Sequence, residues 1–500
     1  MPYIDTSTLA PTDGGRQVYN GLDCCITAEV FEALSRQYNQ PPEIYSFERA
    51  LQAPALEMML RGWKVDDLAR RGMIQTLRDR MVHLDSILQS YAYAVWDRPL
   101  NPQSPKQLID FFYRHMKLPE QWSHKGGKST LSTDREALEK LELYFYARPI
   151  VAVILALRDV KKQLSVLETE IDADGRMRTS YNIAGTETGR WSSSSSSYGT
   201  GTNLQNIARE LRLIFIADKG MKLCGIDLEQ AESREVGWLC GILFGEWSYL
   251  DACLSGDLHT TVSRMAFHNI PWTGDFKKDK ALAEEPCYRH LSFRDLAKKL
   301  GHGSNYYGKP FTMARHAKIP VKTAEEFQDA YFKAFPGIPR WHRWTAQQIQ
   351  TTYQIATVFG RRRHFFGRPN DDSTLREAIA FSPQGATGDR MNLGLWRLWK
   401  HMGKEIQLLG QVHDAVYFQF PEGPPEYEAN VIRRALALIE IPLSDAKSGR
   451  SYVVPGEAKT GWNWGDFNDD PQRGALNPLG LKKFKGQDLR KRLIGLDRIL

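Results

Sequence analysis

The chain of 500 residues has few cysteines and no long apolar run, and each of these absences excludes a class of protein. The six cysteines form no Cys-x-x-Cys pair and have no histidine in zinc-ligand spacing. No apolar stretch approaches the roughly 20 residues needed to span a bilayer, and the N-terminus has no apolar signal core. We therefore expect a reduced, cytoplasmic protein with no membrane partner.

What the sequence does contain indicates a globular chain that is compatible with nucleic acid. Hydrophobic residues make up 42% and charged residues 25%, which is enough for two or more packed units. The net charge of +7 is modest and scattered. Such a charge suits a protein that follows a phosphate backbone, although many basic proteins bind no nucleic acid.

The spacing of apolar residues predicts the elements along the chain. Residues 1–45 are turn-rich and too few for a separate domain, and a helix is expected over about 48–60. Long amphipathic helices are predicted over 73–96 and 134–170. A run of six serines predicts an irregular loop over 192–201.

Two predicted strands each carry an aspartate at or near one end. The first covers 222–227 and places Asp227 before a helical pattern, and the second covers 407–420 and places Asp414 in a tight hairpin. An isolated carboxylate is usually solvated surface, but a charge beside buried strands is costly unless it is paired or binds metal. Carboxylate oxygens suit Mg²⁺, and two such ions about 4 Å apart stabilise the attacking and leaving oxygens of phosphoryl transfer.

A third pattern is a polar and aromatic stripe on one predicted helix. Arg294, Lys298, His302 and Tyr306 recur every four residues, so they lie along one face. A solvated helix face accounts for this spacing equally well. The order of the residues favours a nucleotide site, in which two cations hold a triphosphate and the rings stack on a base and sugar.

These three segments resemble motifs A, B and C of the DNA polymerase I family, in that order. The similarity runs from about Glu48 to Trp464 and includes TETGRWSS, NLQNI, FPGIPRW, FGRRRHF and PQGATGDRMN. The long serine loop is similar to phage members of the family, so the resemblance implies a bacterial cytoplasm, including that of a phage-infected cell. It also implies an α+β right-hand fold with an antiparallel palm sheet, a helical thumb and helical fingers.

The resemblance further implies an order of domains along the chain. The expected ranges are a remnant of an exonuclease domain or docking segment at 1–45, the thumb at 46–180, the first part of the palm at 181–250, the fingers at 251–379, the second part of the palm at 380–470 and a basic C-terminal tail at 471–500. The end of that tail, KKFKGQDLRKRLIGLDRIL, is predicted to form a terminal helix.

The family's functional residues have counterparts here. The resemblance implies that Asp227, Asp414 and the carbonyl of Leu228 bind two Mg²⁺ ions, with Mn²⁺ as a substitute, and that Lys298 is catalytic. The side chains implied to contact the deoxynucleotide are Gln230, Glu232, His259, Arg294, Lys298, His302 and Tyr306. Those implied to contact the primer-template DNA are Arg190, Asn203, Gln205, Arg376, Gln384 and His413, where donors can test minor-groove geometry without reading sequence.

Within this set, Glu232 is implied to pack beneath the incoming sugar and exclude a 2′-hydroxyl, and Tyr306 to lie beside the templating base. The sequence also departs from the family. Ala415 follows Asp414 where the family has a glutamate, and His302 stands where Phe or Tyr is usual. Ala380 stands where the family often has a duplex-contacting Asn.

The segment YNGLDCCITAEVFEAL, with Tyr19 and Asp23, resembles the last motif of the family's proofreading exonuclease. The earlier acidic motifs of that domain are absent, so we expect no proofreading by this chain. A separate exonuclease chain or other replication proteins are expected partners. The alternative is that Tyr19 and Asp23 only begin a docking helix.

Two other functions are weighed against a DNA polymerase. A single-subunit RNA polymerase shares the palm aspartates, but Glu232 would crowd a ribose. An inactive duplex-binding replication scaffold would keep the fold without the chemistry, but Asp227, Asp414, Arg294 and Lys298 are all retained.

Overall fold

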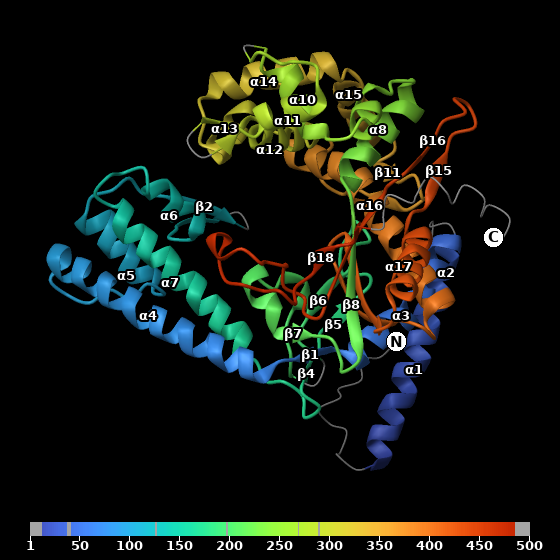
Figure 1. The fold of residues 1–500 in the computed structure, drawn as a ribbon, viewed down its shortest axis with the longest axis horizontal. Helices are drawn as coiled ribbons and strands as arrows, with labels where there is room; N and C mark the ends of the chain where they lie inside the picture. Colours follow the sequence, from blue (N-terminus) through green and yellow to red (C-terminus); the bar gives the residue numbers. More distant parts are fainter. Residues whose placement is uncertain are drawn as a thin grey trace.

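The computed structural model describes residues 13–37, 42–125, 128–196, 199–268, 270–288 and 291–485. Helical lobes lie beside and above a central sheet, in which β8 stands near the middle (Figure 1). Within the described residues, no helix is long and apolar enough to cross a membrane.

The palm is built on a five-stranded antiparallel sheet in the order β13-β14-β8-β17-β18. Its strands are β8 (Met221–Leu228), β13 (Gln407–Val412), β14 (Ala415–Pro421), β17 (Gly456–Gly461) and β18 (Lys482–Lys483). Both strands predicted to carry an aspartate are thus present, and the second is a hairpin. Successive side chains point to opposite faces, so Asp227 lies on the face opposite Ile226 and Leu228.

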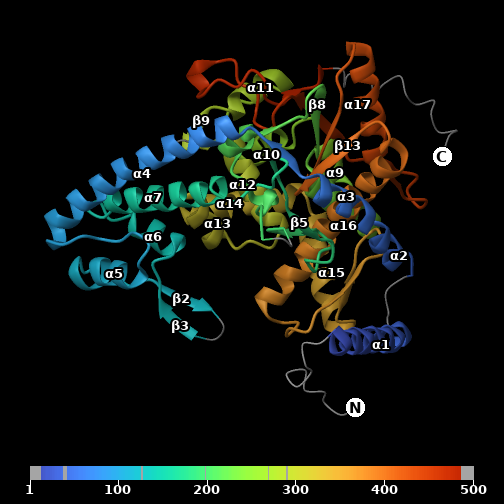
Figure 2. The ribbon, with the colours of Figure 1, turned by 90° about the horizontal axis from the view of Figure 1, so that it is seen from below.

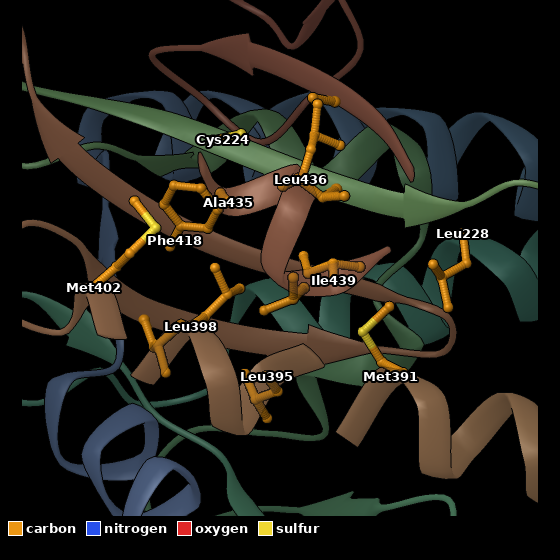
Figure 3. Packing of buried hydrophobic residues seen from close by; sticks show 14 of the residues in the cluster. Cys224, Leu228, Met391, Leu395, Leu398, Met402, Phe418, Ala435, Leu436 and Ile439 are labelled. Carbon is orange, nitrogen blue, oxygen red and sulfur yellow. The ribbon is translucent and has the colours of Figure 1, made fainter. Parts of the chain in front are cut away.

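Two helices cover the apolar face of this sheet, namely α16 (Asp372–Met402) and α17 (Pro425–Ile439). Cys224, Leu228 and Phe418 from the strands pack there against side chains of these helices (Figure 3): Met391, Leu395, Leu398, Met402, Ala435, Leu436 and Ile439. Burying each large apolar side chain contributes about 1.5–3 kcal/mol. This core fixes β8 and β14, and with them the positions of the two aspartates.

The thumb consists of helices that extend away from the sheet (Figures 1 and 2). Its long helices α4 (Asp67–Trp96) and α7 (Arg148–Leu167) lie side by side. Their outer part carries α5 (Pro105–Ile109), the hairpin of β2 (Trp122–Lys125) and β3 (Lys128–Leu131), and α6 (Arg135–Leu141). A core of leucines, isoleucines and phenylalanines holds these elements together.

The fingers form a second helical lobe above the sheet (Figure 1). Its elements are α9 (Ser248–Leu254), α10 (Leu258–Ala266), α11 (Phe276–Ala283), β9 (Pro286–Tyr288), β10 (Leu291–Ser292), α12 (Phe293–Asn305), α13 (Pro310–Ala317), α14 (Val321–Ala334) and α15 (Gly337–Thr351). Leu296 and Leu300 of α12 pack with Phe327 and Tyr331 of α14 in one core. This packing leaves the opposite face of α12 free for the polar stripe.

Short strands and one more helix join the lobes. They are β1 (Trp63–Val65), β4 (Arg176–Met177), β5 (Ser180–Asn182), β6 (Ser192–Ser194), β7 (Phe215–Ile216), α8 (Ala231–Phe244), β11 (Gln354–Ala356), β12 (Arg362–His364), β15 (Pro442–Ser444) and β16 (Ser451–Val453). Two residues separate the end of β8 from the beginning of helix α8, which confirms the predicted strand-to-helix junction near Asp227.

Several predicted elements are wrong in detail. The helix expected over 48–60 is broken into α2 (Pro42–Ala50) and α3 (Gln52–Arg61). Pro54 lacks the N–H that would bond to the carbonyl of Ala50 in a continuous helix, so the backbone hydrogen bonding is interrupted near this point. The helix expected over 134–170 is likewise two helices, α6 and α7, with Pro149 in the first turn of α7.

The serine run and the N-terminal segment also differ from the predictions. The first serines form β6, which pairs with β5, so the loop is shorter than predicted. Residues 1–45 are not simply turn-rich, since α1 (Asp13–Gln37) is a 25-residue helix. Alanine, glutamate, leucine and arginine favour helix there and outweigh the glycines. Helix α1 lies apart from the main body of the molecule (Figure 2).

Two further segments lie elsewhere than the expected domain ranges suggest. Helix α3, in the range expected for the thumb, packs in the palm core through Ala55 and Met58, together with its N-cap residue Leu51. Strand β18, in the range expected for the basic tail, joins the palm sheet. The predicted terminal helix falls mostly on residues 486–500, which lie outside the described residues.

Candidate active site

The two predicted aspartates meet at one end of the palm sheet. Ala415 pairs with Asp227 in the ladder, and the backbone N–H of Leu228 donates to the carbonyl of Asp414 at 3.0 Å. His413 and Asp414 form the turn between β13 and β14, with His413 at a positive φ of 54° that tightens the turn. Hydrogen bonds of the sheet therefore hold two carboxylates close together.

Both carboxyl groups resist ionisation in this position. Burial foremost, and then the charge of Asp414, raise the pKa of Asp227 to about 6, although Lys459 opposes the shift. Burial also raises the pKa of Asp414, against the effect of Arg190. The Asp227 residue as a whole is exposed, so a ligand can reach its carboxylate. The groups packed around that carboxylate nevertheless disfavour its negative charge. A bound cation would relieve this electrostatic cost.

The donor set fits a divalent metal. In the described part of the chain, no three His, Cys, Asp or Glu side chains gather as a metal-binding group. Two carboxylates with hard oxygen atoms are suited to Mg²⁺, which usually keeps several waters and binds substrate phosphates. Asp227 and Asp414 would hold the metal. The backbone of Leu228 lies beside Asp414, where its carbonyl remains a predicted ligand.

A line of contacts connects Asp414 with the fingers. Arg190 Nη2 donates to Asp414 Oδ1 at 3.3 Å and to Glu232 Oε1 at 2.5 Å. The hydroxyl of Tyr306 donates to Glu232 Oε2, and the ring of His302 lies with its centroid 4.8 Å from that of Tyr306. Burial and the charge of Glu232 raise the pKa of Tyr306 well above its usual value, so its hydroxyl keeps its proton.

The predicted stripe lies on α12, with Tyr306 immediately after its last residue. A capping box formed by Ser292 and Asp295 fixes the beginning of this helix. Lys298 and His302 are exposed, which leaves them accessible to a ligand. The neighbouring Arg294 is held by an ion pair with Asp257, at 2.7 Å from its Nε to Oδ2.

Two other predicted nucleotide contacts lie on adjoining helices. His259 is in the first turn of α10, where burial and the charges of Arg294 and Lys298 lower its pKa to about 4. Its ring is therefore neutral at physiological pH. Gln230 precedes α8 with a φ of 53°, and its buried Oε1 has no hydrogen-bond partner within the described residues. A ligand group would satisfy that acceptor.

The fold brings only some of the residues predicted to contact DNA close to one another. Helix α16 passes Arg190 at Gly388, where an added Cβ would lie 3.2 Å from the Arg190 Cγ. Gln384 is one turn earlier on that face. Arg376 is exposed and precedes Gly388 by about 18 Å along the helix. It therefore lies away from the aspartates.

The remaining DNA candidates differ in accessibility. Gln205 is buried, and its amide donates to the side-chain oxygen of Gln411 at 2.9 Å. The side-chain oxygen of Asn203 accepts from the Ser193 hydroxyl at 2.7 Å and from the Gln205 N–H at 3.1 Å. His413 is exposed at its turn. Gln205 and Asn203 therefore support the local backbone in this structure.

Some neighbours of the site were not found from the sequence. Glu457 on β17 pairs with Asp227 on the side away from Ala415, and Lys459 lies on the same face of the sheet. The alternation of charged residues in GEAKTG was the available signal. Asp257 was also missed, although an aspartate just before a helical pattern is typical of an N-cap.

Comparison with known proteins assigns the chain to a family. A sequence model of DNA polymerase family A matches residues 71–465, so the chain belongs to this family. DNA polymerase I of Chloroflexus aurantiacus is 27% identical over 481 residues, covering 90% of this chain and 46% of that protein. DNA polymerase I of Helicobacter pylori is 27% identical over 413 residues, covering 78% and 42%.

A thermostable DNA polymerase I of Thermus filiformis is 28% identical over 435 residues, covering 81% of this chain and 47% of that protein. The chain thus spans about half the length of the curated relatives it matches. The solved POL domain of Pol1 from M. smegmatis, in complex with DNA primer-template and dNTP, superposes with a TM-score of 0.67. It is 24% identical and covers 83% of this chain and 69% of that chain, which confirms the right-hand α+β fold.

Proposed function

We propose that the chain is a template-directed DNA polymerase, which adds deoxynucleotides to a primer 3′-hydroxyl and releases pyrophosphate. The observation that carries the proposal is the line of contacts from His302 through Tyr306, Glu232 and Arg190 to Asp414. It joins the cationic stripe of the fingers to the aspartates of the palm. A reaction between a triphosphate and a primer end requires this proximity.

In the proposed reaction, the primer 3′ oxygen forms a bond to the α-phosphorus as the bond to the pyrophosphate oxygen breaks. Two Mg²⁺ ions held by Asp227, Asp414 and the Leu228 carbonyl would stabilise charge on the attacking and leaving oxygens, with Mn²⁺ as a substitute. Arg294 and Lys298 bind the phosphates, and Lys298 stabilises the leaving pyrophosphate.

The remaining residues orient the substrates. Glu232, held by Arg190 and Tyr306, crowds the 2′ position of the incoming sugar and selects deoxynucleotides. Gln230, His259 and His302 complete the nucleotide site. The duplex contacts Arg190, Arg376, Gln384 and His413, while Asn203 and Gln205 support the backbone beside it. Movement of α12 towards the palm completes the site only around a correct pair.

Primer extension with deoxynucleotides and ribonucleotides in parallel tests the proposal against its two rivals. A DNA polymerase extends the primer with deoxynucleotides in the presence of magnesium and stops when the metal is chelated. An RNA polymerase prefers ribonucleotides. Binding of duplex without any extension would favour the inactive scaffold and contradict the proposal.

We also propose that this chain does not proofread. Tyr19 and Asp23, which resemble an exonuclease motif, are both exposed on the single helix α1. A two-metal hydrolytic site needs several carboxylates that converge from separate segments. The chain incubated with a labelled mismatched primer and magnesium, without nucleotides, should release no terminal nucleotide. Release that Asp23→Ala abolishes would contradict this, and a partner exonuclease chain would be sought by co-purification.

A further inference from the structure

We propose that Asp257 is a positioning residue, which holds Arg294 and the beginning of α10 in the geometry that receives the phosphates of the deoxynucleotide. The inference rests on the proposed polymerase function and deepens it. Asp257 has a defined place in the fold, because it is the N-cap of α10 and faces α12 across the fingers.

Each oxygen of the Asp257 carboxylate accepts two hydrogen bonds. Oδ2 accepts from Arg294 Nε at 2.7 Å and from the Thr260 hydroxyl at 2.8 Å. Oδ1 accepts from Arg294 Nη2 at 3.1 Å and from the His259 backbone N–H at 3.3 Å. The side chain is only 12% exposed, so water contributes little to satisfying these donors. One carboxylate therefore joins two helices.

The bidentate pair fixes the direction in which Arg294 presents its free donors. A guanidinium is planar, so binding its Nε and Nη2 edge to Asp257 also fixes the direction of Nη1. The Arg294 side chain remains 31% exposed, which leaves part of it accessible to phosphate. Holding an otherwise mobile side chain before the substrate arrives lowers the entropy lost on binding.

The same carboxylate fixes His259. Its bonds to the His259 N–H and to the buried Thr260 hydroxyl hold the first turn of α10. His259 is thus placed beside Arg294 and Lys298, whose charges act on its ring. Loss of the Asp257 carboxylate would therefore leave both Arg294 on α12 and His259 on α10 without the hydrogen bonds that position them.

Asp257→Asn is the sharpest single test, because it retains the volume of the side chain. An asparagine replaces one acceptor oxygen with a donor, so it cannot satisfy all four hydrogen bonds and no longer carries the charge that pairs with Arg294. We expect the KM for deoxynucleotides to rise about tenfold, which corresponds to about 1.4 kcal/mol. The effect on kcat should be smaller and the affinity for primer-template DNA unchanged.

Asp275→Asn is a matched control. Asp275 is the N-cap of the neighbouring helix α11 and accepts from the Lys278 N–H at 2.9 Å, while the described residues place no arginine against its carboxylate. This variant should keep the wild-type KM. If it raises KM as much as Asp257→Asn does, the effect comes from general helix capping and the inference is overturned.

A double-mutant cycle tests whether Asp257 acts through Arg294. In an Arg294→Ala background, Asp257→Asn should raise KM by much less than it does alone, because the group it positions is gone. Full additivity of the two effects would overturn the inference. Melting curves of the same variants separate loss of fold from loss of positioning.

Calorimetric titration with inorganic tripolyphosphate distinguishes this inference from the proposed function. A wild-type chain that extends primers, together with an Asp257→Asn variant of unchanged KM and tripolyphosphate affinity, would overturn the inference and leave the function standing. A wild-type chain that extends no primer would contradict the function. Even then, a weaker tripolyphosphate affinity in Asp257→Asn would support the positioning of Arg294, and an equal affinity would refute it.

Discussion

The palm and the fingers hold their charged residues in opposite ways. In the palm, adjacent strands force Asp227 and Asp414 together, and the pKa of each carboxyl group is raised. In the fingers, Arg294 and Lys298 lie four residues apart on α12, which separates them by about 6 Å along the helix. Concentrated negative charges suit compact divalent cations, whereas cations spaced along a helix suit a chain of phosphates.

Substitutions in the palm and in the fingers should therefore affect different steps of the reaction. Under the proposed function, the palm site serves the chemical step, so its loss should reduce kcat. The fingers would mainly serve substrate binding, with Lys298 also assisting the leaving group, so their loss should raise KM. We expect the effects below to decrease in the order given.

The largest effect is expected in the palm. Asp227→Ala or Asp414→Ala should reduce primer extension about 10³-fold or more, because either change removes a proposed metal ligand. Affinity for primer-template DNA, measured by fluorescence anisotropy, should be close to that of the wild type, since basic groups contact the phosphates. Extension at a near wild-type rate by either variant would refute the assignment of the palm site.

The next effect belongs to the fingers. Lys298→Ala should lower kcat/KM for deoxynucleotides about 10²-fold, because it removes the proposed contact to the phosphates. Lys299→Ala is the matched control, since Lys299 is an exposed lysine outside the stripe. Single-turnover kinetics over a range of nucleotide concentrations would measure both variants. An equal loss of kcat/KM in Lys298→Ala and Lys299→Ala would indicate that the stripe is an ordinary solvated helix face.

The two regions should also differ in pH dependence. Asp227, with a pKa of about 6, gains a proton as the pH falls and then no longer binds metal, so extension should be about tenfold lower at pH 5 than above pH 7. More magnesium should shift this midpoint to lower pH, because metal and proton compete. His259, with a pKa of about 4, stays neutral over this range, so His259→Asn should leave the midpoint unchanged. A midpoint that moves with His259 and not with magnesium would assign the titration to the fingers.

The smallest effect is expected where the two regions touch. Glu232→Ala should increase the ratio of ribonucleotide to deoxynucleotide incorporation several-fold, because it removes the side chain that we propose lies beneath the sugar. Tyr306→Phe, which loses only the hydroxyl bonded to Glu232, should change this ratio less. Competition between the two nucleotides on one template would measure it. An unchanged ratio in Glu232→Ala would place the sugar selection elsewhere.

Much of the local structure could be predicted because it follows from a short period in the sequence. The strand near Asp227 and the hairpin around Asp414 come from short apolar runs, and the stripe on α12 comes from a period of about 3.6 residues. The helix breaks near Pro54 and Pro149 and the helix α1 were missed. In those places single prolines and helix propensities decide the backbone, and the apolar period does not report them.

The sequence by itself determined the residue types of the site, the strands and the helix that carry them, and the membership in DNA polymerase family A. Only the tertiary structure decided which of these side chains meet. Arg190 links Glu232 to Asp414, Asp257 holds Arg294, and Glu457 lies beside Asp227, although each pair is far apart along the chain. Sheet order and helix packing decide such contacts, because a local period fixes the face on which a residue lies but not the element that covers that face.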